Sequence, residues 1–515
     1  MKTADIFLYS PNTNKNADFN MWMAFPGPES FALSSLGYLW MFKNIDELED
    51  VNIEAVYSDT HIAHFKPDEL GLIGYSFTFD TDFLTIFSML EKYKIPLKSK
   101  DRGSDFPLIF AGGPVVSANP APYEEFFDFF IIGDGEDVNL QVVNICKNNR
   151  DKNKNELLKM LNELEGVFVP SFPAKSVKKL TKRLEECIYT PIISERAFFK
   201  NTFILEVARG CANRCGFCLA SYLNLPLRFM PYEDVITAIE LGLLHTNKIA
   251  LLGAQLSAHP QFDKICEHIY KKVENGAKIE MSVSSLRVDA ITHDILKTLV
   301  ATGQKNITLA IEAGSERLRR VINKHLEESQ ILHAVDIAVN AGLKGFKFYG
   351  MIGLPTETMD DIDEMIVLAK RIKDKYKGFN ISFGFSTFVP KPNTPFQWCG
   401  RENTKSLEEK SAYLKKEMHK LGIEISVSSA KWDYWQAVLS RGDRTFADFI
   451  VEIYKSGGKL GAFKAAAKKC NINTDYYALE NYPYNKELPW DFIDIRPGKD
   501  FLIKESERLL NYNGV

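Results

Sequence analysis

The residues best suited to chemistry are three cysteines with the spacing Cys-x3-Cys-x2-Cys, at Cys211, Cys215 and Cys218. They follow a mostly apolar run, residues 203–208, that predicts a buried strand. Cysteine thiolates are the usual ligands of iron–sulfur clusters. A [4Fe–4S] cluster has four irons, so three cysteines leave one iron open. An open coordination position is where a substrate or cofactor binds a metal.

A structural zinc site, or three unrelated thiols, is the alternative interpretation. Structural zinc normally takes four ligands, and no Cys or His close to this loop completes the set. The next cysteine, Cys266, lies in an amphipathic run that is typical of a core helix. The spacing favours the cluster and leaves the zinc site open.

Length and composition restrict the other classes of function. A chain of 515 residues, 45% of them hydrophobic, is long enough for two to four domains. A net charge of −4 gives no electrostatic argument for nucleic acid. No apolar stretch reaches the ~20 residues of a membrane span, and the N-terminus lacks a signal-peptide pattern. Eight cysteines do not form a disulfide framework, so a cytoplasmic location is expected.

Residues 1–170 alternate strand and helix patterns, which predicts a doubly wound, Rossmann-like α/β domain. The expected strands are 5–9, 51–57, 71–77, 107–111 and 127–132. Glycines follow the last two of these strands, at Gly112, Gly113, Gly133 and Gly135. In such sheets ligands bind outside the carboxyl ends of the strands, and glycine lets the backbone approach them. Tight turns without a ligand explain the same glycines nearly as well.

Residues 201–425 repeat the strand–helix pattern six times, which predicts a partial (β/α)6 barrel of the TIM type. The expected strands are 203–208, 248–252, 278–283, 306–312, 344–350 and 380–389. Glycine or polar residues follow each strand, among them Gly253, Gln255, Ser284, Arg287, Glu312, Gly350 and Gly353. Polar groups around one cavity suit a zwitterion and a ribose. Helix caps and turns explain any one of these ends, but not readily all six.

Two further segments complete the expected organisation of the chain. Residues 171–200 are interpreted as a linker, and residues 426–515 as a mostly helical C-terminal region. That region contains Trp432, Trp435 and Trp490. Buried tryptophans more often pack a core than line a site, so packing against the rest of the protein is expected.

The cysteine motif directly after a strand resembles the signature of the radical S-adenosylmethionine (radical SAM) superfamily. The resemblance implies a [4Fe–4S] cluster on the three cysteines, with the open iron chelating the amino and carboxylate groups of SAM. It also implies that an electron from the cluster cleaves SAM to a 5′-deoxyadenosyl radical, which abstracts a hydrogen from the substrate.

The same resemblance assigns the barrel's strand ends to SAM. Gly253 and Gln255 stand where the family usually has Gly-Gly-Glu against the methionine amino group, so an amide replaces the carboxylate. Ser284, Arg287 and Glu312 match the ribose and carboxylate contacts.

Gly350 to Gly353 match the glycine-rich strand that lies against adenine in the family. Tyr349, Lys391 and Glu357 are candidates for a general acid or base by position alone.

Gly112-Gly113-Pro114 and Gly133-Asp134-Gly135-Glu136 resemble the cobalamin-binding-type domain that precedes many radical SAM barrels. The usual Asp-x-His-x-x-Gly, whose His ligates cobalt, is absent. The nearest match, residues 59–64, lacks the glycine, and its His61 and His64 are interpreted as loop residues. Members of the subfamily without that His can still hold cobalamin, so this cofactor stays an open question.

Further segments, among them 285–289, 319–324 and 386–391, are similar to one subgroup of these proteins with no established substrate. The resemblance implies a radical SAM enzyme with an unknown substrate and a reductant such as flavodoxin or ferredoxin. With cobalamin it would transfer a methyl group or run a rearrangement.

Two alternatives remain. An RNA or ribosomal-protein methylthiotransferase would carry three further cysteines in its N-terminal domain, where this chain has only Cys146. A non-catalytic SAM or cobalamin sensor would have no need of an oxygen-sensitive electron donor.

Overall fold

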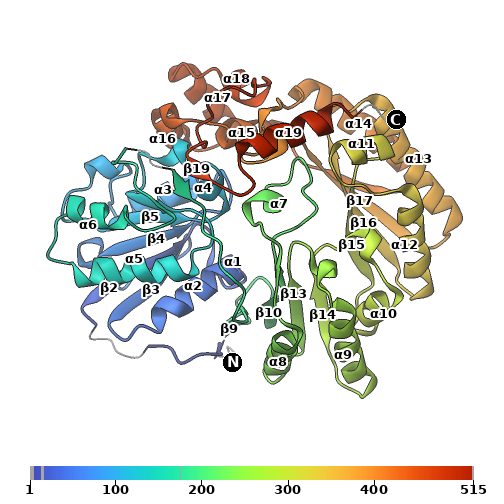
Figure 1. The fold of residues 1–515 in the computed structure, drawn as a ribbon, viewed down its shortest axis with the longest axis horizontal. Helices are drawn as coiled ribbons and strands as arrows, with labels where there is room; N and C mark the ends of the chain where they lie inside the picture. Colours follow the sequence, from blue (N-terminus) through green and yellow to red (C-terminus); the bar gives the residue numbers. More distant parts are fainter. Residues whose placement is uncertain (1–4, 13–16, 174–175, 513–515) are drawn as a thin grey trace.

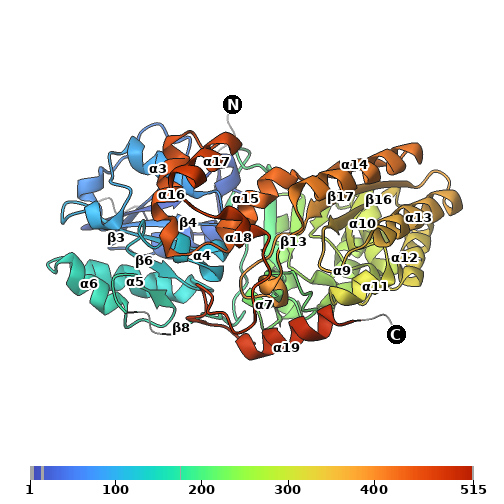
Figure 2. The ribbon, with the colours of Figure 1, turned by 90° about the horizontal axis from the view of Figure 1, so that it is seen from above.

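The computed structural model describes residues 5–12, 17–173 and 176–512. Two α/β bodies lie side by side, and the C-terminal helices lie across the top of both (Figure 1). Seen from above, the same helices cover the line along which the two bodies meet (Figure 2). None of the helices in the described part of the chain is long and apolar enough to cross a bilayer.

The N-terminal body contains a six-stranded sheet in the order β3-β2-β4-β5-β6-β7, parallel except for β7. Its strands are β2 (Phe19–Phe25), β3 (Val51–Tyr57), β4 (Leu72–Ser76), β5 (Leu108–Gly112), β6 (Phe129–Ile131) and β7 (Val167–Phe168). Helices cover both faces, as the doubly wound expectation requires.

One face of this sheet packs against α2 (Leu36–Asp46), α5 (Glu136–Asn148) and α6 (Lys154–Leu161). The other face packs against α3 (Phe83–Lys92) and α4 (Pro114–Ala118), and against helices from the far end of the chain. The sheet is therefore buried on both sides, which is the usual condition of parallel strands.

Two expectations for the first strands need correction. The segment 5–9 contributes only β1 (Ile6–Phe7), which pairs antiparallel with β9 (Ile192–Ile193) outside the large sheet. The missing central strand is β2, which pairs in parallel with both β3 and β4. Four successive residues of this seven-residue strand are buried. The strand therefore does not show the alternation of buried and exposed side chains that marks a half-exposed strand.

The second body is a curved wall of seven parallel strands in two sheets. The strands are β10 (Thr202–Glu206), β13 (Lys248–Leu252), β14 (Glu280–Val283), β15 (Asn306–Glu312), β16 (Gly345–Ile352), β17 (Asn380–Thr387) and β18 (Glu424–Val427). β18 is a strand beyond the six expected, and it crosses the expected domain boundary at residue 425. Among the described residues, a single β-bridge, Leu286 with Leu309, connects the β14 sheet to the β15 sheet.

Helices cover the convex side of this wall, where every second residue of the strands is buried in one core. They are α8 (Tyr232–Leu243), α9 (Phe262–Glu274), α10 (His293–Ala301), α12 (Glu328–Asn340), α13 (Met359–Lys375) and α14 (Thr404–Lys420). The short helix α11 (Glu316–Val321) instead packs in a separate small core with Phe388 and Phe396. The alternate residues face the concave side, where Tyr349 of β16 is 41% exposed.

The C-terminal region is helical and packs against both bodies. Its helices are α15 (Ala430–Ser440), α16 (Ala447–Lys455), α17 (Leu460–Lys469), α18 (Thr474–Ala478) and α19 (Lys499–Leu510). Trp435 and Trp490 lie in the core that includes α3, as expected for packing tryptophans. A short parallel pair, β19 (Ile493–Asp494) with β8 (Val177–Lys178), attaches this region to the expected linker.

Candidate active site

The cysteine loop leaves the carboxyl end of the first barrel strand and is closed by a small antiparallel pair. β11 (Ala208–Arg209) enters the loop and pairs with β12 (Arg228–Phe229), and α7 (Ala220–Leu223) follows the third cysteine. Cys211 and Cys215 are 9% and 6% exposed. The loop therefore holds its thiols against the protein rather than in open solvent.

Burial controls the chemistry of these thiols. It raises the pKa of Cys215 to about 12, while the nearby Lys324 ammonium lowers that pKa. Burial likewise raises the pKa of Cys218. Because the thiolate is the metal-binding form, a metal that binds here must displace these protons.

The number and type of these side chains suit a cluster with one open iron. In the described residues, no three His, Cys, Asp or Glu side chains converge on a point that could hold one metal ion. An iron–sulfur cluster places each cysteine on a different iron, so its ligands need to surround a volume rather than a point. Cys215 and Cys218 each interact electrostatically with Cys211, which puts the three sulfurs in one neighbourhood.

Gln255 contacts the loop directly. Its Oε1 accepts a hydrogen bond from the Ala212 amide at 3.2 Å and lies 3.4 Å from Cys211 Sγ. Ser284, at the end of the next strand, donates to the Gly253 carbonyl at 2.6 Å. The ends of β13 and β14 are thus tied to each other and to the cysteine loop.

Arg287 and Glu312 lie on either side of Lys324. Arg287 forms two hydrogen bonds with Asp289, at 2.8 and 2.7 Å, and also donates to the Lys324 carbonyl at 3.3 Å. Lys324 donates to Glu312 Oε1 at 3.2 Å. Glu312 has a φ of +64°, an uncommon conformation for a residue other than glycine, asparagine or aspartate.

The glycines within and directly after β16 are explained by packing. A Cβ at Gly350 would lie 2.4 Å from the Phe385 ring, and one at Gly353 would lie 2.5 Å from Leu407. Gly353 also has a φ of +75° and donates its amide to Glu357. The contact of these glycines with adenine stays a prediction.

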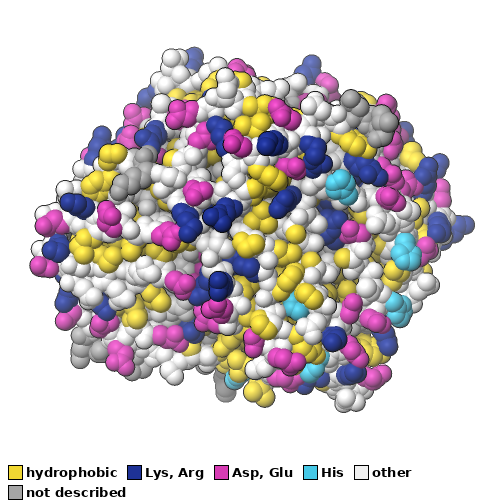
Figure 3. All heavy atoms as spheres, in the orientation of Figure 1, with side chains coloured by type: hydrophobic (Ala, Val, Ile, Leu, Met, Phe, Trp, Pro, Cys, Tyr) yellow, Lys and Arg dark blue, Asp and Glu magenta, His cyan; other side chains and the backbone are white. Residues whose placement is uncertain are grey.

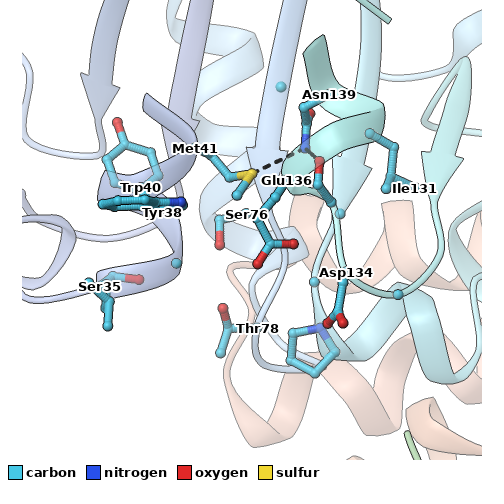
Figure 4. Close-up of a pocket in the computed structure, with 18 of the residues that line it drawn as sticks. Ser35, Tyr38, Trp40, Met41, Ser76, Thr78, Ile131, Asp134, Glu136 and Asn139 are labelled. Atoms are coloured by element: carbon cyan, nitrogen blue, oxygen red, sulfur yellow. Dashed lines mark hydrogen bonds between the residues drawn. The ribbon is translucent and has the colours of Figure 1, made fainter. Parts of the chain in front are cut away.

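A cavity of about 390 Å3 lies outside the carboxyl ends of the N-terminal sheet, and we call it the sheet-end cavity. All four glycines singled out in this domain line it: Gly112, Gly113, Gly133 and Gly135. The barrel closes its other side through Glu206, Arg209, Asn224 and Leu252. In the close-up, Ser76 and Thr78 face Asp134 and Glu136 across this space (Figure 4).

Two buried acceptors on the wall of this cavity have no hydrogen-bond donor among the described residues. They are Oε2 of Glu136 and Oδ1 of Asn139, both on α5. The Asn139 Nδ2 atom, by contrast, donates to the Gly135 carbonyl and lies 3.4 Å from Met41 Sδ (Figure 4). Since a buried unpaired acceptor costs free energy, the cavity suits a ligand that carries N–H or O–H donors.

Sequence reasoning missed an ion-pair group beside this cavity. Arg209 pairs with Glu136 at 2.6 Å, Glu206 at 2.7 Å and Asp134 at 3.2 Å. Arg228 pairs with Asp134 at 2.7 Å. These carboxylates raise the Arg209 pKa against the opposing effect of burial. The sequence signal was four charges at two motifs: Asp134 and Glu136 lie within the second glycine motif, and Glu206 and Arg209 directly precede the cysteine motif.

The three acid–base candidates do not gather at one point. Glu357 is buried and pairs with Lys410 at 2.9 Å. Lys391 pairs with Asp80 at 2.8 Å and lines a separate cavity of about 180 Å3, between the two bodies and α15. Tyr349 faces the open concave side of the barrel.

Comparisons with known proteins agree with this geometry. The model "Radical SAM proteins, N-terminal" matches residues 41–170, and the model "Radical SAM superfamily" matches residues 205–369. An uncharacterized protein of Methanocaldococcus jannaschii is 30% identical over 441 residues, 84% of this chain and 90% of that protein. An uncharacterized methyltransferase of Pyrococcus horikoshii is 22% identical, covering 70% and 76%.

Two similar solved structures share the fold. TsrM from Kitasatospora setae, a radical SAM methyltransferase with cobalamin and a [4Fe–4S] cluster bound, has a TM-score of 0.53 at 11% identity and covers 88% of this chain and 99% of that one. OxsB, a cobalamin-dependent SAM radical enzyme, has a TM-score of 0.53 at 13% identity and covers 91% and 72%. By its cysteine loop, its barrel and its matched relatives, the chain belongs to the radical SAM superfamily of enzymes, which bind a [4Fe–4S] cluster and SAM.

Proposed function

We propose that this protein is a cobalamin-dependent radical SAM methyltransferase acting on an unknown substrate. In this proposal Cys211, Cys215 and Cys218 hold the cluster, and the sheet-end cavity holds the corrinoid. The bound cofactors supply an electron for SAM cleavage and a carrier for the methyl group. A reductant such as flavodoxin or ferredoxin is the expected external partner.

The sheet-end cavity carries this proposal. Cobalamin has amide side chains around its ring, and their N–H groups are the donors that Glu136 Oε2 and Asn139 Oδ1 lack. Gly113 and Gly133 line the same cavity, although close packing already accounts for both glycines, because a Cβ would lie 2.6 Å from the Phe77 carbonyl oxygen and 2.4 Å from that of Leu180. TsrM and OxsB, which share the fold, are described with cobalamin bound.

The residues at the barrel's strand ends have defined tasks in this proposal. Gln255, already within hydrogen-bond reach of the loop, accepts from the methionine ammonium of SAM. Glu312 accepts from the ribose hydroxyls. Arg287 is held in place by Asp289 and directs its remaining donors to the carboxylate of SAM.

Anaerobic reconstitution tests the proposal. Purified protein would be loaded with iron, sulfide and hydroxocobalamin, and passed through gel filtration. We expect cluster and corrinoid absorption to elute together with the protein. A Ser76→Phe variant fills the cavity and should lose the corrinoid bands while keeping the cluster; Ser104→Phe, at an exposed position away from the cavity, is the matched control.

The products then separate the classes of reaction. With dithionite and SAM, 5′-deoxyadenosine establishes SAM cleavage. Deoxyadenosine from wild-type protein that retains no corrinoid would refute methyl transfer through cobalamin and leave a hydrogen-abstracting enzyme. A protein that takes up no cluster would refute the whole proposal.

A further inference from the structure

The C-terminal helix α19 lies against the cysteine loop, although the sequence places the two far apart. The helix contacts α11 and the turn at residues 395–398. Its Leu509 belongs to a small core with Ile322, Phe388 and Phe396, against which Phe217 of the loop also packs. The loop between the cluster cysteines is therefore covered by residues from the end of the described chain.

A relay of hydrogen bonds connects the helix to the loop backbone. Arg508 donates to Asn323 Oδ1 at 2.9 Å. The Nδ2 atom of the same amide donates to the carbonyls of Asn213 and Arg214, at 2.9 and 3.0 Å. The Asn323 side chain thus accepts one hydrogen bond from α19 and donates two to the residues between Cys211 and Cys215. The charged donor and His325 Nε2, which lies 2.8 Å from the same oxygen, together fix which way the amide faces.

Apolar contacts also hold the next residues of the cysteine loop in place. A Cβ at Gly216 would lie 2.7 Å from the Phe396 ring and 3.0 Å from Leu509 Cδ1. The Gly216 backbone bonds on both sides, its N–H to the Ile322 carbonyl and its carbonyl to the Phe396 N–H, each at 3.0 Å. The Arg214 guanidinium lies 5.1 Å from the centre of the Phe501 ring, on the same helix.

The loop needs this support because its backbone is strained. Arg214 has a φ of +50° and Asn323 a φ of +61°. Asparagine tolerates this region, but arginine is disfavoured there by its Cβ, so the conformation persists only where the surroundings impose it. The Asn323 amide bonds to the carbonyl of that same Arg214.

We propose that α19 is part of the cluster site, with Arg508 and Leu509 as positioning residues. Acting through Asn323 and Gly216, they hold residues 213–217 in the conformation that presents the thiols to the cluster. The inference rests on the proposed function only in assigning the cluster to this loop. The alternative is that α19 merely covers a core.

The helix itself supplies the control for that alternative. Leu502, also on α19, is buried in the larger core with Trp490 and Phe168, and not in the small core where Leu509 meets Phe217. Leu502→Ala should lower global stability without changing the loop. Arg508→Ala removes one exposed side chain, and Lys504→Ala removes an exposed charge from the same helix.

The first experiment uses metal-free, reduced full-length protein. Iodoacetamide alkylation, followed by mass spectrometry, gives the rate at each cysteine, and the buried Cys266 serves as an internal reference for global opening. We expect Arg508→Ala to raise the Cys215 rate relative to Cys266 roughly tenfold, the factor for loss of one charged hydrogen bond. Leu509→Ala should raise the same rate through loss of its packing against the loop. Arg508→Lys should restore part of the protection.

The second experiment follows iron in reconstituted protein. Release of iron to a chelator should be several-fold faster in Arg508→Ala than in wild type or Lys504→Ala. Unchanged Cys215 alkylation, or a change no larger than that in Leu502→Ala, would overturn the inference. If wild-type protein took up no iron, the proposed function would fail, while the alkylation result would still decide the role of α19.

Discussion

Arg209 forms an ion pair with Oε1 of Glu136 at 2.6 Å, and the other oxygen of that carboxylate, on the wall of the sheet-end cavity, has no hydrogen-bond donor among the described residues. Arg209 precedes Cys211 by two residues, and Glu136 begins α5 of the other body. A ligand that donates to Glu136 therefore touches the same carboxylate that fixes the entry to the cysteine loop. The two candidate cofactor sites share a residue pair.

Removing Arg209 should destabilise the protein strongly. Arg209→Ala leaves the buried carboxylates of Asp134 and Glu136 short of a counter-charge, and loss of one partner of a buried pair costs roughly 3–5 kcal/mol. Urea unfolding measures the change. Arg196→Ala, which breaks pairs of a half-exposed arginine with Asp5 and Glu29, should cost less than about 1 kcal/mol. Equal losses in both variants would contradict the burial argument.

The two neighbouring glycines of the cavity should respond differently to alanine. Gly113 has a φ of +122°, and a Cβ there would lie 2.6 Å from the Phe77 carbonyl oxygen. Gly113→Ala should lower the free energy of unfolding by roughly 1–3 kcal/mol. A Cβ at Gly112 meets only ordinary contacts with Ile131, so Gly112→Ala should fold with near wild-type stability. Chemical denaturation of both variants, in parallel, tests the difference.

Glu124 should make stability depend on pH near neutrality. Burial raises its pKa from 4.5 to about 7, although Arg444 opposes the rise. Because the folded protein holds this proton more tightly than the unfolded chain, its contribution is complete below about pH 4.5 and is lost as pH rises through about 7.

The matched variant is Glu124→Gln. Between pH 5.5 and 8, wild-type protein should lose on the order of 2 kcal/mol more stability than the variant. Urea unfolding at each pH gives the difference, with the exposed Asp105→Asn as control. Parallel pH profiles for wild type and Glu124→Gln would show that the proton on Glu124 has no part in stability.

Cys215 and Cys266 are both buried, but only the first should matter for iron. Cys215→Ala should lose the visible cluster absorption and bound iron after reconstitution. Cys266→Ala should keep both, at a cost in stability from the cavity left in the α9 core. Iron and sulfide analysis decides the matter. Full iron content in Cys215→Ala would remove that thiol from the ligand set.

The motifs were readable from sequence because each combines residue type with strand position. The cysteine spacing, the paired glycines and the repeated strand–helix pattern all depend on neighbours along the chain. β2 was not predicted because Met21, Trp22 and Met23 are buried in succession and include no β-branched residue. Burial on both faces removes the alternation from which a strand is normally recognised.

Contacts between distant segments could not be predicted in the same way. Arg209 and Glu136 each appear in the sequence as an ordinary charge beside a motif, and their pairing requires the placement of one body against the other. The segment that α19 contacts could not be predicted from the sequence either. Its periodicity predicts a packed helix, whereas the loop that it contacts depends on how the whole barrel is closed.

Figure 3 shows basic and acidic side chains intermingled on one face of the molecule, in keeping with the small net charge. Long-range attraction of one charge type is therefore a weak guide to partners on that face. Recognition there depends on short-range fit.

The barrel wall consists of two sheets, which we call leaves. Among the described residues a single β-bridge, between Leu286 and Leu309, joins them. Gln255 and Ser284 stand on one leaf with the cysteine loop, and Glu312 and Gly350 stand on the other. The two leaves nevertheless share one hydrophobic core on the convex side of the wall. A molecule that touches both leaves from the concave side adds contacts across a joint that side-chain packing already holds.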